Sequence, residues 1–343
     1  MHKDLQPIAV PLVAWFGQNK RELPWRQDKN PYHVWVSEIM LQQTRIEAVI
    51  EHYYAFMAAL PTVESLAAVP EERLLKLWEG LGYYSRARNL KKAAQVIMET
   101  YGGNFPQEYA ALVKLPGIGA YTAGAIASIC FNEKVPAVDG NVLRVLARLQ
   151  ADRSNVLDPA VKKAAEALIH DILPDDAGDF NEGIMELGET VCLPNGLPLC
   201  DKCPLKNYCK AYRQNITAEL PVRIKKTQRR LEEKTVFLFY SPQGELALNK
   251  RGDSGLLAGL YELPNVDSFL EENCIAARAR QWGLEPLEIT YLKDCKHIFT
   301  HIEWQMRCYT VRVKEKNESF DWCTAEALES DYALPTAFAK CLD

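Results

Sequence analysis

Four of the ten cysteines lie close together in the sequence. Cys192, Cys200, Cys203 and Cys209 follow the spacing C-x7-C-x2-C-x5-C, and four thiolates within so short a segment can hold one compact metal centre. Structural zinc sites more often show two short cysteine pairs separated by a longer loop. A series of short intervals, with Pro204 directly after the third cysteine, is more typical of iron–sulfur ligands. The spacing therefore predicts a metal site, with an iron–sulfur cluster favoured and zinc as the alternative.

Two carboxylates lie in contexts that suit acid–base chemistry. Glu38 interrupts the apolar run 35–41, and apolar surroundings raise the pKa of a carboxyl, as a general acid requires. A position on the rim of a half-exposed helix explains Glu38 equally well. Asp139 precedes the helical pattern 142–148, and an Asp at that place usually caps the following helix. On the residues alone, a helix cap is the better interpretation of Asp139.

A tight turn, LPGIG at 115–119, separates two helical patterns. Its glycines, Gly117 and Gly119, allow close approach of the backbone to a ligand, and N–H groups at a helix N-terminus bind one phosphate. The pattern predicts a helix–hairpin–helix over about 108–131, which would contact a DNA backbone without reading its sequence. A plain turn between two helices is the alternative.

The elements that must position these residues differ between the two parts of the chain. Pro31, with Asn30 as N-cap, is predicted to begin one long helix whose apolar residues continue to Phe56. Further helical patterns cover 64–77, 85–100, 107–115, 120–131, 141–149 and 159–172. Later in the chain, 235–240, 245–250 and 302–313 predict strands, and 267–281 and 324–329 predict helices. The expected fold class is an all-α domain followed by an α+β domain.

The length of 343 residues and the ordinary composition indicate a globular protein of two domains. We expect these domains at 1–217 and 235–343, joined by a linker at 218–234 that holds six Lys or Arg against three Asp or Glu. Residues 235–343 hold 11 basic against 17 acidic residues, so the net charge of −5 comes mainly from the second domain. Neither a secretory signal nor a membrane-spanning stretch is expected, which predicts a cytoplasmic protein.

The order of these features (Glu38, the hairpin, Asp139, the four cysteines) resembles that in the endonuclease III superfamily of DNA glycosylases. More narrowly, the chain is similar to the adenine DNA glycosylases of the MutY family, which carry a C-terminal Nudix-like domain. The resemblance covers nearly the whole chain from about Leu23. It includes LPWR at 23–26, WEGLGYYSRAR at 78–88, FNE at 180–182, GLLAGLYELP at 255–264 and FTH at 299–301.

This resemblance implies a mechanism with two carboxylates, as in retaining glycosidases. Glu38 would protonate N7 of an adenine flipped out of the duplex, and ionised Asp139 would stabilise the oxocarbenium-like sugar. Tyr121 and Asn141 would support the two carboxylates. Tyr121 occupies the place where bifunctional relatives have a catalytic lysine, so the resemblance implies a monofunctional enzyme without Schiff-base chemistry.

The resemblance also implies contacts with DNA and with the bases. Arg26 and Glu182 would contact adenine, and Phe299, Thr300 and His301 would contact the opposite base, 8-oxoguanine. Other expected DNA contacts are Gln42, Gln43, Thr44, Leu81, Gly82, Tyr83, Gly117 and Gly119, with Gln43, Leu81 and Tyr83 as wedges in the base stack. For Leu81 and Tyr83, filling core space is the alternative.

The implied cofactor is one 4Fe–4S cluster on the four cysteines. The first cysteine interval has seven residues here, where the family usually has six.

The implied partner is double-stranded DNA with A opposite 8-oxoguanine or A opposite G. The resemblance implies that a monomer binds this DNA during base excision repair in the bacterial cytoplasm, at the nucleoid. The alternatives are a glycosylase for another mismatch, such as one that removes thymine, and an inactive iron–sulfur DNA-binding module. The second domain lacks the glutamate-rich helix of Nudix hydrolases, because Glu271 and Glu272 are followed by AARAR at 276–280.

Overall fold

The computed structural model describes residues 5–224 and 229–342. The chain divides into two compact units. The first unit comprises Met1–Ala68 and Asn89–Lys225, and the second comprises Val69–Arg88 and Lys226–Asp343. The segment Val69–Arg88 therefore groups with the C-terminal part of the chain, although its sequence lies between helices of the first unit.

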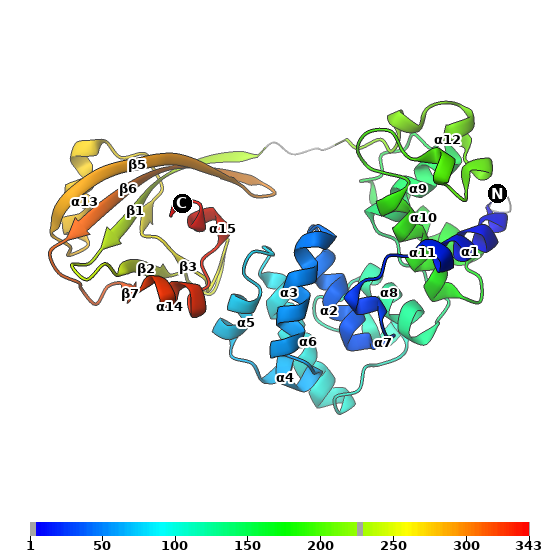
Figure 1. The fold of residues 1–343 in the computed structure, drawn as a ribbon, viewed down its shortest axis with the longest axis horizontal. Coiled ribbons are helices and arrows are strands. Elements are labelled where there is room, and N and C mark those ends of the chain that lie inside the picture. Colours follow the sequence, from blue (N-terminus) through cyan, green and yellow to red (C-terminus); the bar gives the residue numbers. More distant parts are fainter. Residues whose placement is uncertain (1–4, 225–228, 343) are drawn as a thin grey trace. The chain divides into compact units, whose positions relative to one another are not determined.

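The part of the chain before residue 225 is helical, as the sequence predicts (Figure 1). Its α-helices are α1 (Ala9–Asn19), α2 (Pro31–Leu41), α3 (Ile46–Ala59), α4 (Val63–Ala68), α5 (Glu71–Leu77), α6 (Ser85–Tyr101), α7 (Tyr109–Leu112), α8 (Ala120–Phe131), α9 (Gly140–Gln150), α10 (Pro159–Ile172), α11 (Ala177–Thr190) and α12 (Lys210–Arg213). Short 3-10 turns lie at Gln6–Ile8, Pro24–Arg26, Cys200–Lys202, Lys206–Tyr208 and Thr217–Glu219.

The prediction of one long helix from Pro31 to Phe56 is wrong. Helix α2 begins as expected, with the Tyr32 N–H donating to the Asn30 side chain at 2.9 Å, but it ends at Leu41, and α3 begins at Ile46. Between them Gln43 adopts a left-handed conformation with φ of 61°. The apolar residues Ile39 and Ile46 are seven positions apart, which equals about two helical turns. Their spacing therefore concealed the break.

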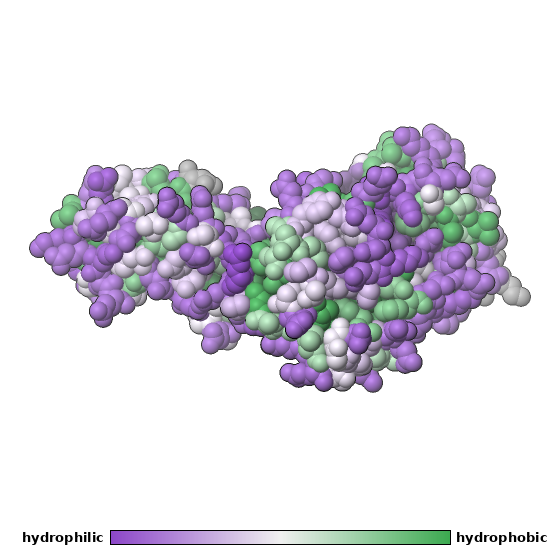
Figure 2. All heavy atoms as spheres, turned by 60° about the horizontal axis from the view of Figure 1, so that its bottom comes forward, coloured by the Kyte–Doolittle hydropathy of each residue, from purple (hydrophilic) through white to green (hydrophobic). Residues whose placement is uncertain are grey.

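The core of the helical unit surrounds α8 and α11. Residues 122–129 of α8 are all buried, and α8 packs against α2 and α11. Helix α9 also approaches α11 closely: a Cβ atom at Gly188 would lie 2.7 Å from Cβ of Asn141. Figure 2 shows hydrophilic residues over most of the face in view, with smaller hydrophobic areas between them. Among the described residues, no helix is long and apolar enough to cross a membrane.

The C-terminal part forms a mixed sheet with the strand order β3-β2-β1-β6-β5. Its strands are β1 (Arg230–Tyr240), β2 (Leu246–Lys250), β3 (Tyr261–Glu262), β4 (Asn265–Val266), β5 (Pro286–Ile298), β6 (Ile302–Val313) and β7 (Asp321–Cys323). Strands β1 and β6 are parallel, while β5 and β6 form an antiparallel hairpin. The short strands β4 and β7 pair with β1 and β2, respectively.

Both faces of this sheet are covered, as the alternation along β1 shows. Val236 and Leu238 join one core cluster, which includes Phe338 of α15 (Thr336–Ala339). Phe237 and Phe239 join the other cluster, which includes residues of α13 (Glu272–Gln281). A short helix, α14 (Ala325–Ser330), follows β7. The predicted class, an all-α part followed by an α+β part, is confirmed.

Two details of the second part differ from the sequence prediction. Strand β1 begins at Arg230, inside the predicted linker 218–234, because 230–234 pair with 302–306 of β6. Residues 225–228 of that linker lie outside the described residues. Strand β5 was not predicted, because it is largely exposed and rich in polar side chains.

Candidate active site

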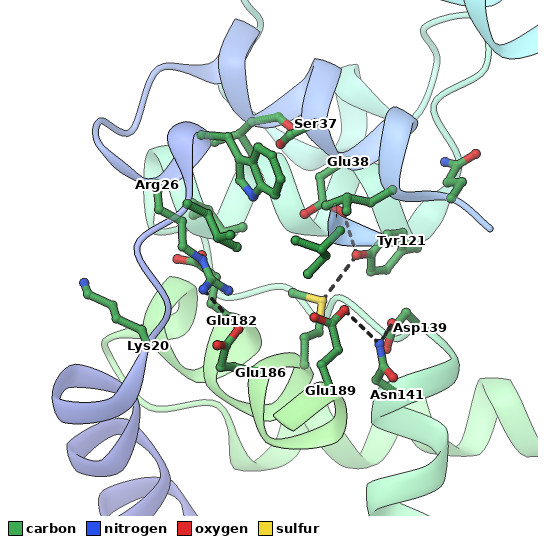
Figure 3. A pocket seen from close by; sticks show the side chains of 18 of the residues that line it. Lys20, Arg26, Ser37, Glu38, Tyr121, Asp139, Asn141, Glu182, Glu186 and Glu189 are labelled. Atoms are coloured by element: carbon green, nitrogen blue, oxygen red, sulfur yellow. Dashed lines mark hydrogen bonds and ion pairs between the residues drawn. The ribbon is translucent and has the colours of Figure 1, made fainter. Parts of the chain in front are cut away.

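A cavity of about 480 Å³ opens among the helices of the first unit (Figure 3). Its walls come from α2, α8, α9, α11 and the turn Pro24–Arg26. Eight residues predicted to act in catalysis or binding line it together: Arg26, Glu38, Gln42, Gln43, Tyr121, Asp139, Asn141 and Glu182. Thr44 follows Gln43 but is not part of the lining. Residues that are more than 100 positions apart thus meet in one polar cavity.

Glu38 projects from α2 toward Tyr121 of α8 (Figure 3). The Tyr121 hydroxyl donates to Oε2 of Glu38 at 2.6 Å and also lies 3.2 Å from the sulfur of Met185. Burial raises the pKa of Glu38 to about 7; the Tyr121 hydrogen bond lowers the pKa, and the nearby charge of Asp139 raises it. A carboxyl with this pKa exchanges protons near neutral pH, as the sequence led us to expect for a general acid.

Asp139 both caps a helix and lines the cavity. Its Oδ1 accepts the Val142 N–H at the start of α9 at 2.8 Å, and its Oδ2 accepts the Asn141 side-chain amide at 2.8 Å. Burial raises the pKa of Asp139, while these hydrogen bonds lower it. The helix-cap interpretation of Asp139 is therefore correct, but it does not exclude chemistry, because the carboxylate faces the same cavity as Glu38.

Helix α11 contributes an acidic face that the sequence reasoning recognised only in part. Glu182 accepts from Nε of Arg26 at 2.8 Å, and Glu186 accepts from Arg26 at 3.0 Å and from Arg21 at 2.6 Å. Glu189 also pairs with Arg21. The spacing of four and three residues along α11 places these three glutamates on one face, a signal that the sequence did contain. Burial raises the pKa of Glu182, although Arg26 opposes this.

Polar side chains of α9 connect this cavity with the cysteine-rich loop. Arg144 donates to Oδ1 of Asn141 at 2.7 Å and to the carbonyl oxygen of Cys192 at 2.8 Å. One turn further along α9, Arg148 donates to the sulfur of Cys192 at 3.1 Å. Since Asn141 also donates to Asp139, a continuous series of hydrogen bonds runs from the carboxylate to the first cysteine.

The four clustered cysteines line one small cavity together. Besides the Arg148 bond to Cys192, the Tyr212 N–H donates to the sulfur of Cys209 at 3.4 Å. The seven-residue interval is closed by a hydrogen bond from the Leu199 N–H to the Val191 carbonyl at 2.9 Å. Residues 194–197 of this interval are exposed. The loop therefore has room for its extra residue at the surface.

The predicted hairpin has the expected form, with α7 and α8 on either side of the turn. Gly117 has φ of 75°, and a Cβ atom there would lie 2.5 Å from Cβ of Asn89, so only glycine fits. Gly119 is the N-cap of α8 and provides no side-chain cap. The first turn of this helix therefore has no capping side chain, and Gly119 and Ala120 are exposed, as an anion site requires.

The second unit joins two segments that were predicted separately to contact DNA. The hydroxyls of Tyr83 and Thr300 lie 2.8 Å apart, and both residues line a cavity of about 610 Å³ together with Gly82, Phe299 and His301. Tyr83 is half exposed, and Thr300 and His301 are exposed at the turn between β5 and β6. Leu81 is only 5% exposed, so in this conformation it fills core space.

Comparisons with known proteins agree with both parts of the chain. Residues 36–171 match the HhH-GPD superfamily of base excision DNA repair proteins, and residues 235–343 match the NUDIX domain. Among solved structures, a thermostable thymine-DNA glycosylase is 29% identical with a TM-score of 0.55, and it covers 62% of this chain and 98% of its own. A non-covalent endonuclease III–DNA complex is 25% identical with a TM-score of 0.53, and it covers 63% and 98%, respectively.

A curated relative connects both parts in one protein. The adenine DNA glycosylase of Mus musculus is 35% identical over an alignment that covers 98% of this chain and 77% of the mouse protein. The similarity thus extends across the helical part with its acidic cavity and across the sheet-containing part. From this full-length similarity, the two domain matches and the paired carboxylates in the cavity, we conclude that the chain belongs to the adenine DNA glycosylase family.

Proposed function

We propose that this protein removes adenine from DNA in which adenine is paired with 8-oxoguanine or guanine, acting as a monomer. The observation that carries the proposal is the cavity in which Tyr121 holds Glu38 opposite the capped carboxylate Asp139. Adenine is a normal base, so such an enzyme must also recognise the base opposite. The second unit, with its exposed turn at 299–301, supports that second task.

The proposed reaction uses Glu38 first as an acid and then as a base. Protonated Glu38 gives its proton to N7 of the flipped adenine, and the bond between C1′ and N9 breaks with its electron pair remaining on the base. The carboxylate of Asp139 stabilises the positive sugar. Ionised Glu38 then accepts a proton from the attacking water, whose oxygen bonds to C1′. The products are free adenine and an abasic site.

Incubation with three duplexes, containing A opposite 8-oxoguanine, A opposite G and T opposite G, tests the proposal. We expect free adenine from the first two, and strand breakage only after alkali, because Tyr121 lacks the amine needed for a Schiff base. Borohydride should trap no covalent adduct efficiently. Release of thymine would favour the alternative glycosylase, and release of no base would favour the DNA-binding module.

Replacement of Tyr121 by Phe should move the alkaline limit of the reaction to higher pH. Glu38 must be protonated to act, so the single-turnover rate should fall as the pH rises through about 7. The Tyr121 hydrogen bond favours ionised Glu38, and its loss therefore raises the pKa of Glu38. A hydrogen bond to a charged group is worth about 1.5–3 kcal/mol, which predicts a shift of about one to two pH units. The pH–rate profile measures this shift.

The matched control for this prediction is Tyr54→Phe, because Tyr54 is 56% exposed and lies on α3, outside the cavity lining. Its profile should equal that of the wild type. An unchanged or lower alkaline limit in Tyr121→Phe would mean that the hydroxyl does not control the protonation of Glu38.

Replacement of Phe299 by Ala should weaken discrimination between 8-oxoguanine and guanine more than it slows base release. Stacking of an aromatic side chain on a base contributes about 1–3 kcal/mol, so we expect the preference to fall by about 5-fold to 100-fold. Competition between a duplex with A opposite 8-oxoguanine and one with A opposite guanine measures this preference. Leu287→Ala, at the exposed start of β5, is the control. Equal loss of activity on both duplexes would exclude the proposed role.

We further propose that the four cysteines hold one 4Fe–4S cluster, which when bound would cross-link the loop that follows α11. All four cysteines line one small cavity, so their thiolates can hold one centre together. Their short intervals, with Pro204 directly after the third cysteine, support an iron–sulfur cluster over a single zinc ion. The donors Arg148 and Tyr212 would stabilise thiolate charge.

Iron analysis of anaerobically purified protein should give about four iron atoms for each chain, with the broad visible absorption of an iron–sulfur cluster. Cys200→Ser should lose most of this iron, since it removes one of four ligands. Cys130→Ser, which changes a cysteine outside the loop, is the control. Stoichiometric zinc at these four cysteines in place of iron would contradict the cluster.

A further inference from the structure

Three cysteines that are scattered in the sequence converge in the second unit. Cys295 lies on β5, Cys308 lies on β6, and Cys341 lies two residues after the end of α15. The sulfur of Cys295 lies 3.2 Å from that of Cys341 and 3.6 Å from that of Cys308. All three sulfurs lie within 4.8 Å of one another. This group is separate from the four cysteines of the first unit.

The distances between these sulfurs suit one bound ion. Tetrahedral thiolate ligands of zinc are about 3.8 Å apart, so a small adjustment brings all three onto a common metal. A disulfide would use only two of the thiols, and Cys295 has two neighbours at similar distances. A single metal ion accounts for the convergence of all three sulfurs, whereas a disulfide leaves the third unexplained.

The surroundings of the three thiols also suit a metal site. Cys308 and Cys341 are fully buried and belong to the core cluster that contains Trp304, whereas Cys295 is partly exposed and gives an ion access. His297 lies two residues after Cys295, on the same face of β5. Its Nδ1 is buried and has no hydrogen-bond partner within the described parts of the chain, so this imidazole is a candidate for the fourth position after a rotation of its side chain.

We propose that Cys295, Cys308 and Cys341 form a second metal site, which binds one thiophilic divalent ion of the zinc type. Three thiolates and one nitrogen or water are a common ligand set for zinc. The site would attach the C-terminal segment to the β5–β6 hairpin. Metal binding to such a set also stabilises the folded domain, because the ligands are brought together only on folding.

The site lies close to the turn that is proposed to recognise the lesion. The ring of His297 contacts that of Phe299, with centroids 4.6 Å apart, and Phe299 contacts Trp304 at 4.8 Å. The metal would therefore fix the base of the 299–301 turn. This functional consequence, unlike the metal site itself, rests on the function proposed above for that turn.

Zinc content of the full-length protein, purified with a thiol reductant and supplied with zinc, tests the proposal. We expect Cys295→Ser and Cys341→Ser each to lose about one zinc per chain relative to the wild type. Two controls should retain it: Cys323→Ser, a buried cysteine of the same unit, and Cys274→Ser, an exposed one. Zinc bound in the first unit would remain in all four variants, so the difference reports only on the proposed site.

X-ray absorption at the zinc edge of the wild type provides a measurement that does not depend on folding of a variant. In protein that carries about four iron atoms per chain, so that the cysteines of the first unit are occupied, we expect the zinc to have sulfur neighbours at about 2.3 Å. Neither measurement requires DNA or base release, so the outcome is independent of the proposed glycosylase activity. The proposal is overturned if the zinc content of the wild type equals that of Cys295→Ser and Cys341→Ser. It is equally overturned if mass spectrometry finds a Cys295–Cys341 disulfide in the reduced preparation.

Discussion

Glu38→Gln should reduce adenine release by about a hundredfold to ten-thousandfold while leaving binding to the lesion duplex nearly unchanged. The amide cannot donate the proton that the leaving base needs, and positioned acid–base groups contribute rate factors of this size. The Gln carbonyl can still accept the Tyr121 hydroxyl, which donates to Glu38 at 2.6 Å in the native protein. The shape of the cavity should therefore survive. Single-turnover kinetics and equilibrium binding measure the two effects separately.

Glu47→Gln is the matched control for this variant. Glu47 lies on α3, is exposed and is not part of the cavity lining, so the same chemical change there should leave the rate within about twofold of the wild type. If Glu38→Gln retained most of the wild-type rate, or if it lost affinity in parallel with rate, Glu38 would not be the acid.

The two carboxylates illustrate what a sequence can and cannot predict about such a site. An apolar environment for Glu38 was predictable from its neighbours in α2, and the raised pKa followed from it. The catalytic role of Asp139 was not predictable. An N-cap aspartate looks the same in sequence whether or not its carboxylate also faces a cavity. Only the packing of α9 against α11 makes that distinction, and it depends on contacts between residues far apart in the chain.

Ion pairs between distant segments could not be predicted from the sequence either. Glu186 and Glu189 follow Glu182 at helical spacing, but their partner Arg21 lies 165 and 168 positions away. The same reason applies to Cys295, Cys308 and Cys341, which share no sequence spacing and meet only because β5, β6 and the C-terminal segment lie together. The clustered cysteines, by contrast, were predictable as one group because only short intervals separate them.

Asp139→Asn separates the structural role of this residue from its chemical one. Asn caps a helix about as well as Asp, so the bond to the Val142 N–H and the free energy of unfolding should change little. The negative charge that stabilises the sugar is lost, however. Removal of one preorganised electrostatic group typically costs about a hundredfold to a thousandfold in rate, and we expect a loss of this size in single-turnover adenine release.

A second helix of the same unit provides the control for this prediction. Asp158 caps α10 by accepting the Ala160 N–H at 2.9 Å, and it lies outside the cavity lining. Asp158→Asn therefore makes the same substitution at the same kind of helix position, and it should leave adenine release unchanged. A similar small loss in both variants would show that Asp139 acts only as a cap. A large loss confined to Asp139→Asn, with both proteins equally stable, would show that its charge acts on the reacting sugar.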